Sequence, residues 1–242
     1  MGVDDHSPTL EITDRSTLRR RRDRGSHDRA EAYAILDEGI VCHVAFVIDG
    51  EPCIVPMAYA RIGDTLYLHG AVANRMLRHM ATGAAVCVAV TLVDGLVLAR
   101  AAFHHSMNYR SVVLYGVGAR TQDVDEIDAA TAALLEHMAP GRSAEARPPT
   151  DIERTATMFI RFPIEEGSVK IRRGPPIDDE EDLGLDVWAG VVPFAMVPGE
   201  GQRDELLSPD VATPPYVEAY PPRARSVDHS HRRDRLFDST TR

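Results

Sequence analysis

The sequence predicts a mainly β protein of the α+β class, an antiparallel barrel of six or seven strands with peripheral helices. Short apolar runs rich in β-branched residues follow one another closely. Several are separated by Asp-Gly or Gly-Asp pairs, which favour tight hairpin turns. Strands do not alternate regularly with helices, as a doubly wound parallel sheet would require. Hairpin connections are therefore expected for most of the sheet.

The expected strands follow from this reading of the apolar runs. Six lie close together, at residues 40–48, 52–62, 65–70, 84–93, 96–103 and in the stretch ending at Gly116, and two later runs, 155–164 and 167–173, are further strand candidates. Asp49-Gly50 predicts a tight hairpin between the first two strands. Asp94-Gly95 predicts a turn of the same kind between 84–93 and 96–103.

Three helices and the domain limits complete the expected fold. A helix is expected to start after Asp28 and to end at Gly39, and others at 73–83 and 124–139. The last has apolar residues at i, i+3 and i+4, as in an amphipathic helix. We expect a flexible arm at 1–27, a barrel domain at 28–198, and a poorly ordered tail, rich in Pro, Gly, Ser and charge, at 199–242.

Composition excludes several classes of protein. The net charge of −10 argues against a broad nucleic-acid surface. No apolar run approaches the roughly 18–20 residues of a membrane span, and the first residues lack the apolar region of a secretory signal. A cytoplasmic protein is expected. The three cysteines lie in apolar runs, which favours small core residues over a disulfide framework.

A first candidate site begins where the strand 65–70 ends, in the sequence LHGAVANRMLR. Gly70 is followed by Asn74, a helix-capping residue type, and by Arg75 and Arg78. Free N–H groups at a helix start, together with arginine, suit an anion such as phosphate. A solvated amphipathic helix explains the same spacing, and the spacing alone slightly favours that explanation.

The histidines do not predict a metal site. His104 and His105 are adjacent, so on a strand only one of them could point inward. The barrel sequence has no CxxC, HxxxH or HxH spacing, and the pair His229/His231 lies in the tail. His69 ends a strand beside Gly70, which leaves it either a core histidine or part of the first candidate site.

A second candidate site is the stretch FHHSMNYRSVVLYG at residues 103–116. Hydrogen-bonding side chains lead directly into a buried strand, and they include Asn108, Tyr109, Arg110 and Ser111. Burying Arg110 without an anion is costly, so a ligand is favoured over a water-filled strand entry. Asp94 belongs to a turn-forming pair, and turn chemistry explains it without a role as general base.

Four segments together carry a resemblance to a known family. They are YAILDEGIVCHVAFV (33–47), PMAYARIGDTLYLHG (56–70), the run from RMLR to VLYG (75–116), and SVKIRRGPP…DVWAGVVPF (168–194). In combination they resemble the pyridoxamine 5′-phosphate oxidase-like FMN-binding split barrels. The chain is most similar to the branch of flavin-nucleotide-binding proteins near the nitroimidazole-resistance reductases. The resemblance covers roughly residues 28–195.

The resemblance implies a split barrel and a homodimer with two FMN sites in grooves between subunits. Arg110 and Ser111 match positions around the flavin ring and phosphate, and Trp188 lies where relatives close the partner's site. An aromatic core anchor is the alternative for Trp188. The implied cofactor-binding residues are Pro56, Met57, His69, Gly70, Ala71, Asn74, Arg75, Asn108, Tyr109, Arg110, Ser111 and Trp188.

The resemblance also implies which functions are expected for this chain and which are not. Ala71 and Asn74 stand where the branch usually has serines, and the Arg and His substrate motif of true pyridoxamine phosphate oxidases is not found. Vitamin B6 oxidation is therefore not assigned. The leading hypothesis is an FMN-dependent oxidoreductase that reduces a small organic electrophile, with His69 as catalytic proton donor. The alternatives are a flavin, deazaflavin or haem binding or sensing protein without turnover, and a dimeric scaffold with an empty site.

Overall fold

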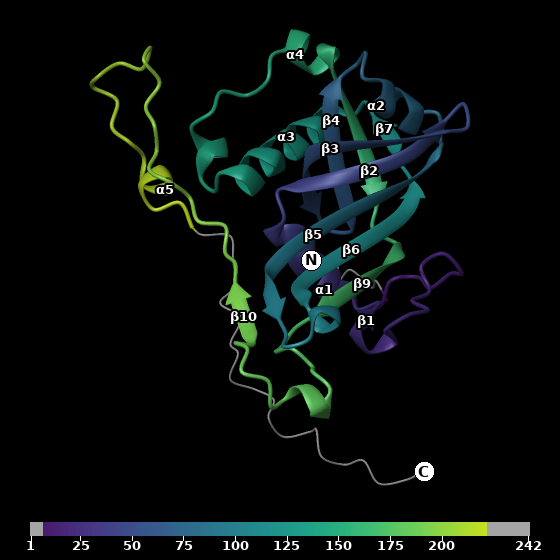
Figure 1. The fold of residues 1–242 in the computed structure, drawn as a ribbon. Coiled ribbons are helices and arrows are strands. Elements are labelled where there is room, and N and C mark those ends of the chain that lie inside the picture. Colours follow the sequence, from purple (N-terminus) through teal and green to yellow (C-terminus); the bar gives the residue numbers. More distant parts are fainter. Residues whose placement is uncertain (1–6, 222–242) are drawn as a thin grey trace.

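A computed structural model describes residues 7–221 and gives a mainly antiparallel β fold (Figure 1). The strands are β1 (Gly25–Ser26), β2 (Val41–Ile48), β3 (Glu51–Ile62), β4 (Thr65–Ala71), β5 (Ala85–Leu98), β6 (Ser106–Val117), β7 (Ala119–Thr121), β8 (Thr157–Pro163), β9 (Glu166–Arg172) and β10 (Gly190–Pro193). They follow the spatial order β1-β9-β6-β5-β2-β3-β4-β8-β7, and β10 pairs with β5. The sheet is not closed, so the expected split barrel with peripheral helices is confirmed.

The helices are short apart from two. They are α1 (Arg29–Glu38), α2 (Arg75–Met80), α3 (Val124–Met138), α4 (Asp151–Ala156) and α5 (Pro215–Glu218), with 3-10 turns η1 (Arg22–Arg24), η2 (Ala102–His104), η3 (Arg142–Ala144) and η4 (Glu180–Asp182). Asp28 caps α1 as expected, because its side chain accepts a hydrogen bond from the N–H of Glu31 at 2.9 Å. Within the described part of the chain, no helix is both long and apolar enough to span a bilayer.

Two apolar clusters hold these elements together. The larger fills the barrel, where side chains of β2 to β6, β8 and β9 pack against Ala32, Ile35 and Leu36 of α1. The smaller lies between α3 and the outer side of β3, β4 and β8. Burial of this apolar area is the main stabilising contribution to both contacts. The clusters leave the outward face of β2 and of the first half of β3 uncovered, where Val41, Val47 and Ile54 are exposed.

The expected turn at Asp94-Gly95 is wrong. β5 runs through both residues as one strand and only shifts register against β6 between Val93 and Gly95. The chain reverses later, at η2. A Cβ at Gly95 would lie 2.6 Å from the carbonyl oxygen of Val192, so glycine is needed here because β10 passes close to β5.

The N-terminal segment differs from the flexible arm that was expected, as far as the structure describes it. Leu10 is buried, β1 pairs with β9, and Arg15 forms an ion pair with Glu166 of β9. Residues 7–27 thus pack against the barrel. The segment after β10 leads to α5, which lies beside η3, since the Tyr216 hydroxyl donates to Oε2 of Glu145 at 2.6 Å (Figure 1). Residues 1–6 and 222–242, including His229 and His231, lie outside the described residues.

Candidate functional site

The first candidate site forms where β4 meets α2. Asn74 caps α2, since its side-chain oxygen accepts a hydrogen bond from the N–H of Leu77 at 3.1 Å. A Cβ at Gly70 would lie 3.1 Å from Cδ1 of Leu77, so glycine lets the helix start close to the strand. The sequence Gly70 to Asn74 therefore fixes where the first turn of α2 stands relative to the barrel.

An open cavity of about 490 Å³ lies between this turn and the adjacent strands. Its walls are Phe46 of β2, Cys53, Ile54 and Val55 of β3, and Asn74, Arg75 and Met76 at the start of α2. The volume falls within the range of small-molecule sites, which is roughly 300–1,000 Å³. The lining combines apolar side chains with one amide and one guanidinium, a composition that suits a ligand with a flat apolar part and an anionic end.

Arg75 is the charged group of this cavity. Its side chain is exposed, and no carboxylate within residues 7–221 forms an ion pair with it. α2 has only six residues, so its dipole contributes little and the guanidinium supplies most of the positive charge. A guanidinium with free donors can bind a phosphate through two parallel hydrogen bonds.

His69 stands just before Gly70 but does not line the cavity. Its ring stacks on Phe159, with centroids 5.6 Å apart, and its Nδ1 is buried without a hydrogen-bond partner among the described residues. Burial lowers the pKa of His69, which keeps the imidazole neutral at pH 7. An unpaired buried nitrogen of this kind is a group that a ligand could satisfy.

Arg110 occupies different surroundings from those the sequence suggested. Its Nε donates to Asp94 Oδ2 at 2.9 Å, its Nη2 donates to Glu38 Oε1 at 2.7 Å, and its Nη1 also donates to Glu38. Hydrogen bonds to Glu38, then to Asp94, raise the pKa of Arg110. The anion that buried Arg110 requires is therefore supplied by the chain itself, and the argument for a ligand at this position is corrected.

The other polar side chains of β6 also have internal partners. Asn108 is buried, donates to the carbonyl of Gly174 at 3.2 Å and accepts a hydrogen bond from Arg172. The Ser111 hydroxyl donates to the carbonyl of Lys170 at 3.3 Å. These bonds join β6 to β9 and the loop after it. Tyr109 is half-buried on the same strand.

The remaining predicted residues lie outside the cavity wall. Pro56 and Met57 follow Val55 on β3, where Pro56 is exposed and Met57 packs against the core. Ala71 is exposed at the end of β4. Trp188 is 65% exposed, so the alternative of a core anchor is wrong.

Within one chain, only some of the predicted site residues lie close together. Asn74 and Arg75 meet at the cavity with Gly70 behind them, whereas β6 is separated from β3 by β5 and β2. Sequence reasoning missed the apolar wall, because Phe46, Cys53 and Ile54 were expected only as strand residues. Alternation along β3 could have identified Ile54, which points outward and is 64% exposed.

The chain is similar to one protein family and to several solved structures. Residues 28–171 match the sequence model of the family described as pyridoxamine 5′-phosphate oxidase. A FAD and heme binding protein from Mycobacterium smegmatis is 35% identical, with a TM-score of 0.77 over 80% of this chain and 95% of that one. The flavocytochrome Anf3 from Azotobacter vinelandii is 33% identical, with a TM-score of 0.79 over 85% of this chain and 95% of that one.

A more distant structure supports the fold alone. It is described as a candidate 5-nitroimidazole antibiotic resistance protein from Bacteroides thetaiotaomicron and is 22% identical, with a TM-score of 0.50 over 60% of this chain and 86% of that one. No curated protein sequence matches the chain. The family model covers more than half of the residues, and two relatives exceed 30% identity over most of both chains. The chain therefore belongs to the pyridoxamine 5′-phosphate oxidase family.

Proposed function

We propose that this protein is a flavin-dependent oxidoreductase that binds a flavin nucleotide at the cavity between β3 and α2. The observation that carries the proposal is the pairing of an open apolar cavity with Arg75, which has no carboxylate partner among the described residues. The descriptions of the two relatives above 30% identity, which name FAD and a flavocytochrome, support the same cofactor class. FMN, expected from sequence, is the form we propose first.

The residues present fit such a group. Arg75 would bind the phosphate, and the amide of Asn74, already capping α2 through its oxygen, keeps its NH₂ available as a donor. The apolar side chains of Phe46, Ile54 and Val55 would contact the ring system. A bound flavin supplies electron transfer between a reduced nicotinamide donor and a small organic electrophile, while the protein orients it and excludes water.

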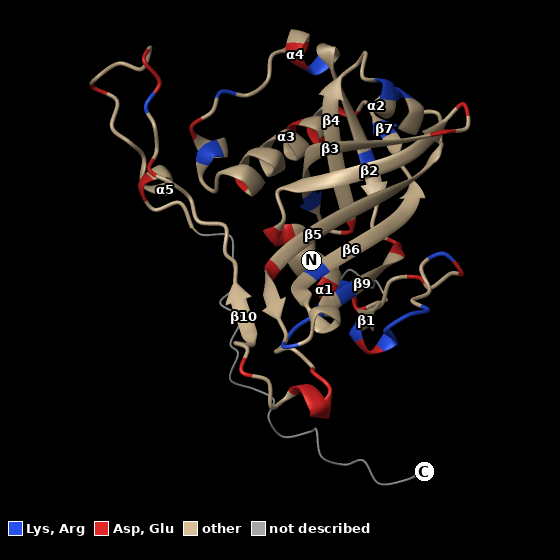
Figure 2. Ribbon diagram, in the orientation of Figure 1, with Lys and Arg blue, Asp and Glu red and all other residues tan. Residues whose placement is uncertain are grey.

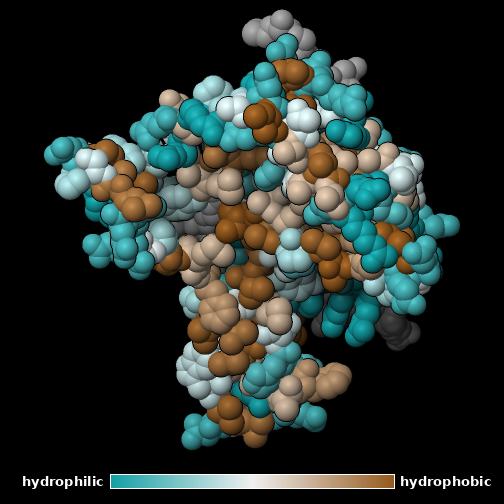
Figure 3. Space-filling model, turned by 90° about the horizontal axis from the view of Figure 1, so that it is seen from above, coloured by the Kyte–Doolittle hydropathy of each residue, from teal (hydrophilic) through white to brown (hydrophobic). Residues whose placement is uncertain are grey.

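We further propose a homodimer in which the cavity opens into the subunit groove. Ile54 lines the cavity and is 64% exposed, and Val41 and Val47 on β2 are 43% and 55% exposed. Figure 3 shows hydrophobic side chains gathered on one face of the molecule between hydrophilic ones. Exposed apolar side chains beside a cavity favour an interaction site on this face. A second chain there would bring the exposed segment around Trp188 to the cavity.

Flavin together with haem, bound without turnover of an organic substrate, is the second candidate. Neutral His69, with its unpaired buried Nδ1, favours it, because a neutral imidazole nitrogen is a common haem-iron ligand. Both relatives above 30% identity are described as containing haem or as a flavocytochrome. If this candidate holds, His69→Ala removes the haem absorption and leaves the flavin bound.

An absorption spectrum of the full-length protein, purified without added cofactor, tests the proposal. We expect flavin bands, a released mass of FMN or FAD, and reduction by NADH or NADPH followed by reoxidation by a small electrophile. A Soret band would favour the second candidate. A colourless protein that takes up neither FMN nor FAD would overturn both candidates, and light scattering that finds only single chains would overturn the homodimer.

A further inference from the structure

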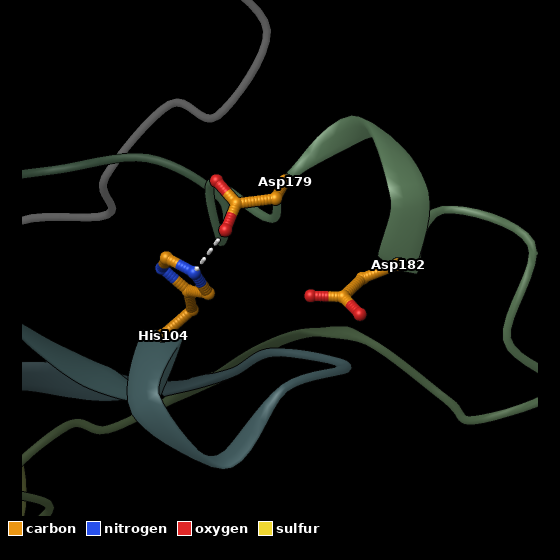
Figure 4. A group of neighbouring side chains, drawn as sticks. All are labelled: His104, Asp179 and Asp182. Atoms are coloured by element: carbon orange, nitrogen blue, oxygen red, sulfur yellow. Dashed lines mark hydrogen bonds and ion pairs between the residues drawn. The ribbon is translucent and has the colours of Figure 1, made fainter.

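The segment between β9 and β10 contains five consecutive acidic residues, Asp178 to Asp182. Figure 2 shows this acidic turn in red, on the segment that leads into β10. Two of its carboxylates, those of Asp179 and Asp182, point toward the ring of His104 on η2 (Figure 4). Side chains from two segments about 75 residues apart therefore converge on one small volume.

The distances within this group suit a metal ion. Nε2 of His104 lies 3.1 Å from Oδ2 of Asp179, and one potential ligand atom from each of the three residues lies within 4.8 Å of the others. Bonds of about 2.0–2.2 Å from a metal to nitrogen and oxygen place any two ligands within about 4.4 Å of each other. Small side-chain rotations would bring the three atoms to that separation.

Neither carboxylate is paired with an arginine or a lysine of the described residues. Asp179 occupies the N-cap position of η4, yet its side chain makes no capping hydrogen bond and turns to His104 instead. Asp182 has no ion pair with an arginine or lysine anywhere in residues 7–221. Nearby negative charges repel one another, so a cation between them would stabilise this arrangement.

A buried neighbour holds the group in place. The carboxylate of Asp178 is 1% exposed, accepts hydrogen bonds from the N–H of Arg100 at 2.9 Å and from Nη1 of Arg100 at 3.0 Å. It also accepts one from the N–H of Ala101 at 3.5 Å. This clamp fixes the residue before Asp179 against the residues that precede His104. The backbone beside two of the three ligands is therefore held in place before any metal arrives, which lowers the entropic cost of binding.

We infer that His104, Asp179 and Asp182 form a binding site for a divalent transition-metal cation. One imidazole nitrogen and two carboxylate oxygens suit zinc or manganese, with water completing the coordination because the site is open to solvent. The ion would join η2 to η4 and so hold the segment that leads into β10. The site shares no residue with the cavity between β3 and α2.

Calorimetric titration with zinc tests this site on the full-length protein after chelator treatment and dialysis. All proteins carry His229→Ala and His231→Ala, because the HSH sequence in the tail could bind zinc by itself. We expect one zinc per chain, and at least a roughly tenfold loss of affinity in both His104→Ala and Asp182→Asn. The neighbouring substitutions His105→Ala and Glu181→Gln are the matched controls and should leave the affinity unchanged.

Hydrogen exchange provides a second readout. Zinc should slow exchange of backbone amides in residues 178–193 in the parent and the two controls, and not in His104→Ala or Asp182→Asn. If His104 and Asp179 form only an ion pair, neither zinc nor the substitution Asp182→Asn should change the exchange rates of these amides. The inference is overturned by a lack of binding at about 1 mM zinc, or by binding that survives both ligand substitutions. Flavin content is measured in the same samples, so failure here is distinct from failure of the proposed function.

Discussion

The sequence predicts an anionic partner for both Arg75 and Arg110, but the two arginines have opposite surroundings in the fold. Arg75 is exposed beside a cavity and meets no carboxylate of the described residues, whereas Arg110 is buried and donates to Glu38 and Asp94. Both acids are distant along the chain, by 72 and 16 residues. An arginine near a strand end thus predicts an anion, and only the fold decides whether that anion belongs to a ligand or to the protein.

The two arginines are therefore expected to have different roles, one in the stability of the fold and the other in ligand binding. Arg110 fastens the end of α1 to β5 and β6, so it acts on stability. Arg75 lines the cavity and has no ion-pair partner among the described residues, so we expect it to act on binding. The expected effects of substitution differ accordingly in kind and in size.

The largest expected effect is the loss of stability in Arg110→Ala. Two carboxylates with side chains 14% and 10% exposed would lose their shared cation, and breaking a buried ion pair costs roughly 3–5 kcal/mol. Urea unfolding followed by circular dichroism measures the change. The surface substitution Arg75→Ala should stay within about 0.5 kcal/mol of the parent.

If the Arg110→Ala variant is too unstable to purify, the Arg110→Lys variant is measured in its place. Lysine keeps the charge but cannot form the paired hydrogen bonds to both acids, so an intermediate loss of stability is expected. Equal stability of Arg110→Lys, Arg75→Ala and the parent would remove the contrast between the two arginines.

Asn74 allows stability and binding to be separated at one position. Asn74→Ala removes the cap of α2 and should cost about 1 kcal/mol in unfolding free energy. Asn74→Asp keeps the cap and the stability but places a negative charge beside the proposed phosphate, so flavin affinity should fall. Paired urea unfolding and flavin titrations of the two variants provide the measurement. If Asn74→Asp binds flavin as tightly as the parent, the phosphate does not lie at α2.

His69 should give the protein a dependence of stability on pH. Burial lowers its pKa in the folded state, whereas the unfolded chain takes up a proton below about pH 6.5. The unfolded state then binds more protons, so stability is lost as the pH falls below about 6.5. Unfolding free energies between pH 7 and 5 should decline less steeply in His69→Gln, with the exposed His43→Gln as control. Identical slopes in His69→Gln and the parent would contradict the burial of a neutral imidazole.

The smallest expected effect is a difference in thiol reactivity. Burial raises the pKa of Cys42 to about 12 and also raises the pKa of Cys87, whereas Cys53 lines the cavity. Iodoacetamide at pH 8 should therefore modify Cys53 first and leave Cys42 unmodified. Added FMN should slow the reaction of Cys53, as followed by mass spectrometry. Protection of Cys87 rather than Cys53 would place the ligand elsewhere.

Local patterns were sufficient to predict most of the fold. Asp49-Gly50 forms the expected hairpin between β2 and β3, and the period of apolar residues predicted α3 within one residue of its observed end. The turn predicted at Asp94-Gly95 is wrong because Gly95 is required for another reason. The backbone of Val192, far along the chain, passes too close for a side chain at this position. The residues next to a glycine do not show whether it forms a turn or allows another strand to approach closely.

The site was less predictable than the fold, for the same physical reason. Asn74 and Arg75 could be proposed from sequence because capping and charge are local signals, and both lie on the cavity wall. The partners of Arg110 could not be found, because Glu38 is at the end of α1 and meets β6 only after the barrel forms. His104 and His105 were expected on a strand, yet they belong to a 3-10 turn and the residue after it, where His104 faces Asp179.

Flavin titration of Arg75→Ala against Arg78→Ala tests the central claim most directly. Both arginines are exposed on α2, but only Arg75 lines the cavity. A hydrogen bond to a charged group contributes about 1.5–3 kcal/mol, so Arg75→Ala should bind FMN or FAD roughly 10- to 100-fold more weakly. Arg78→Ala should match the parent. Equal affinity of Arg75→Ala and the parent would show that the cavity between β3 and α2 is not the flavin site.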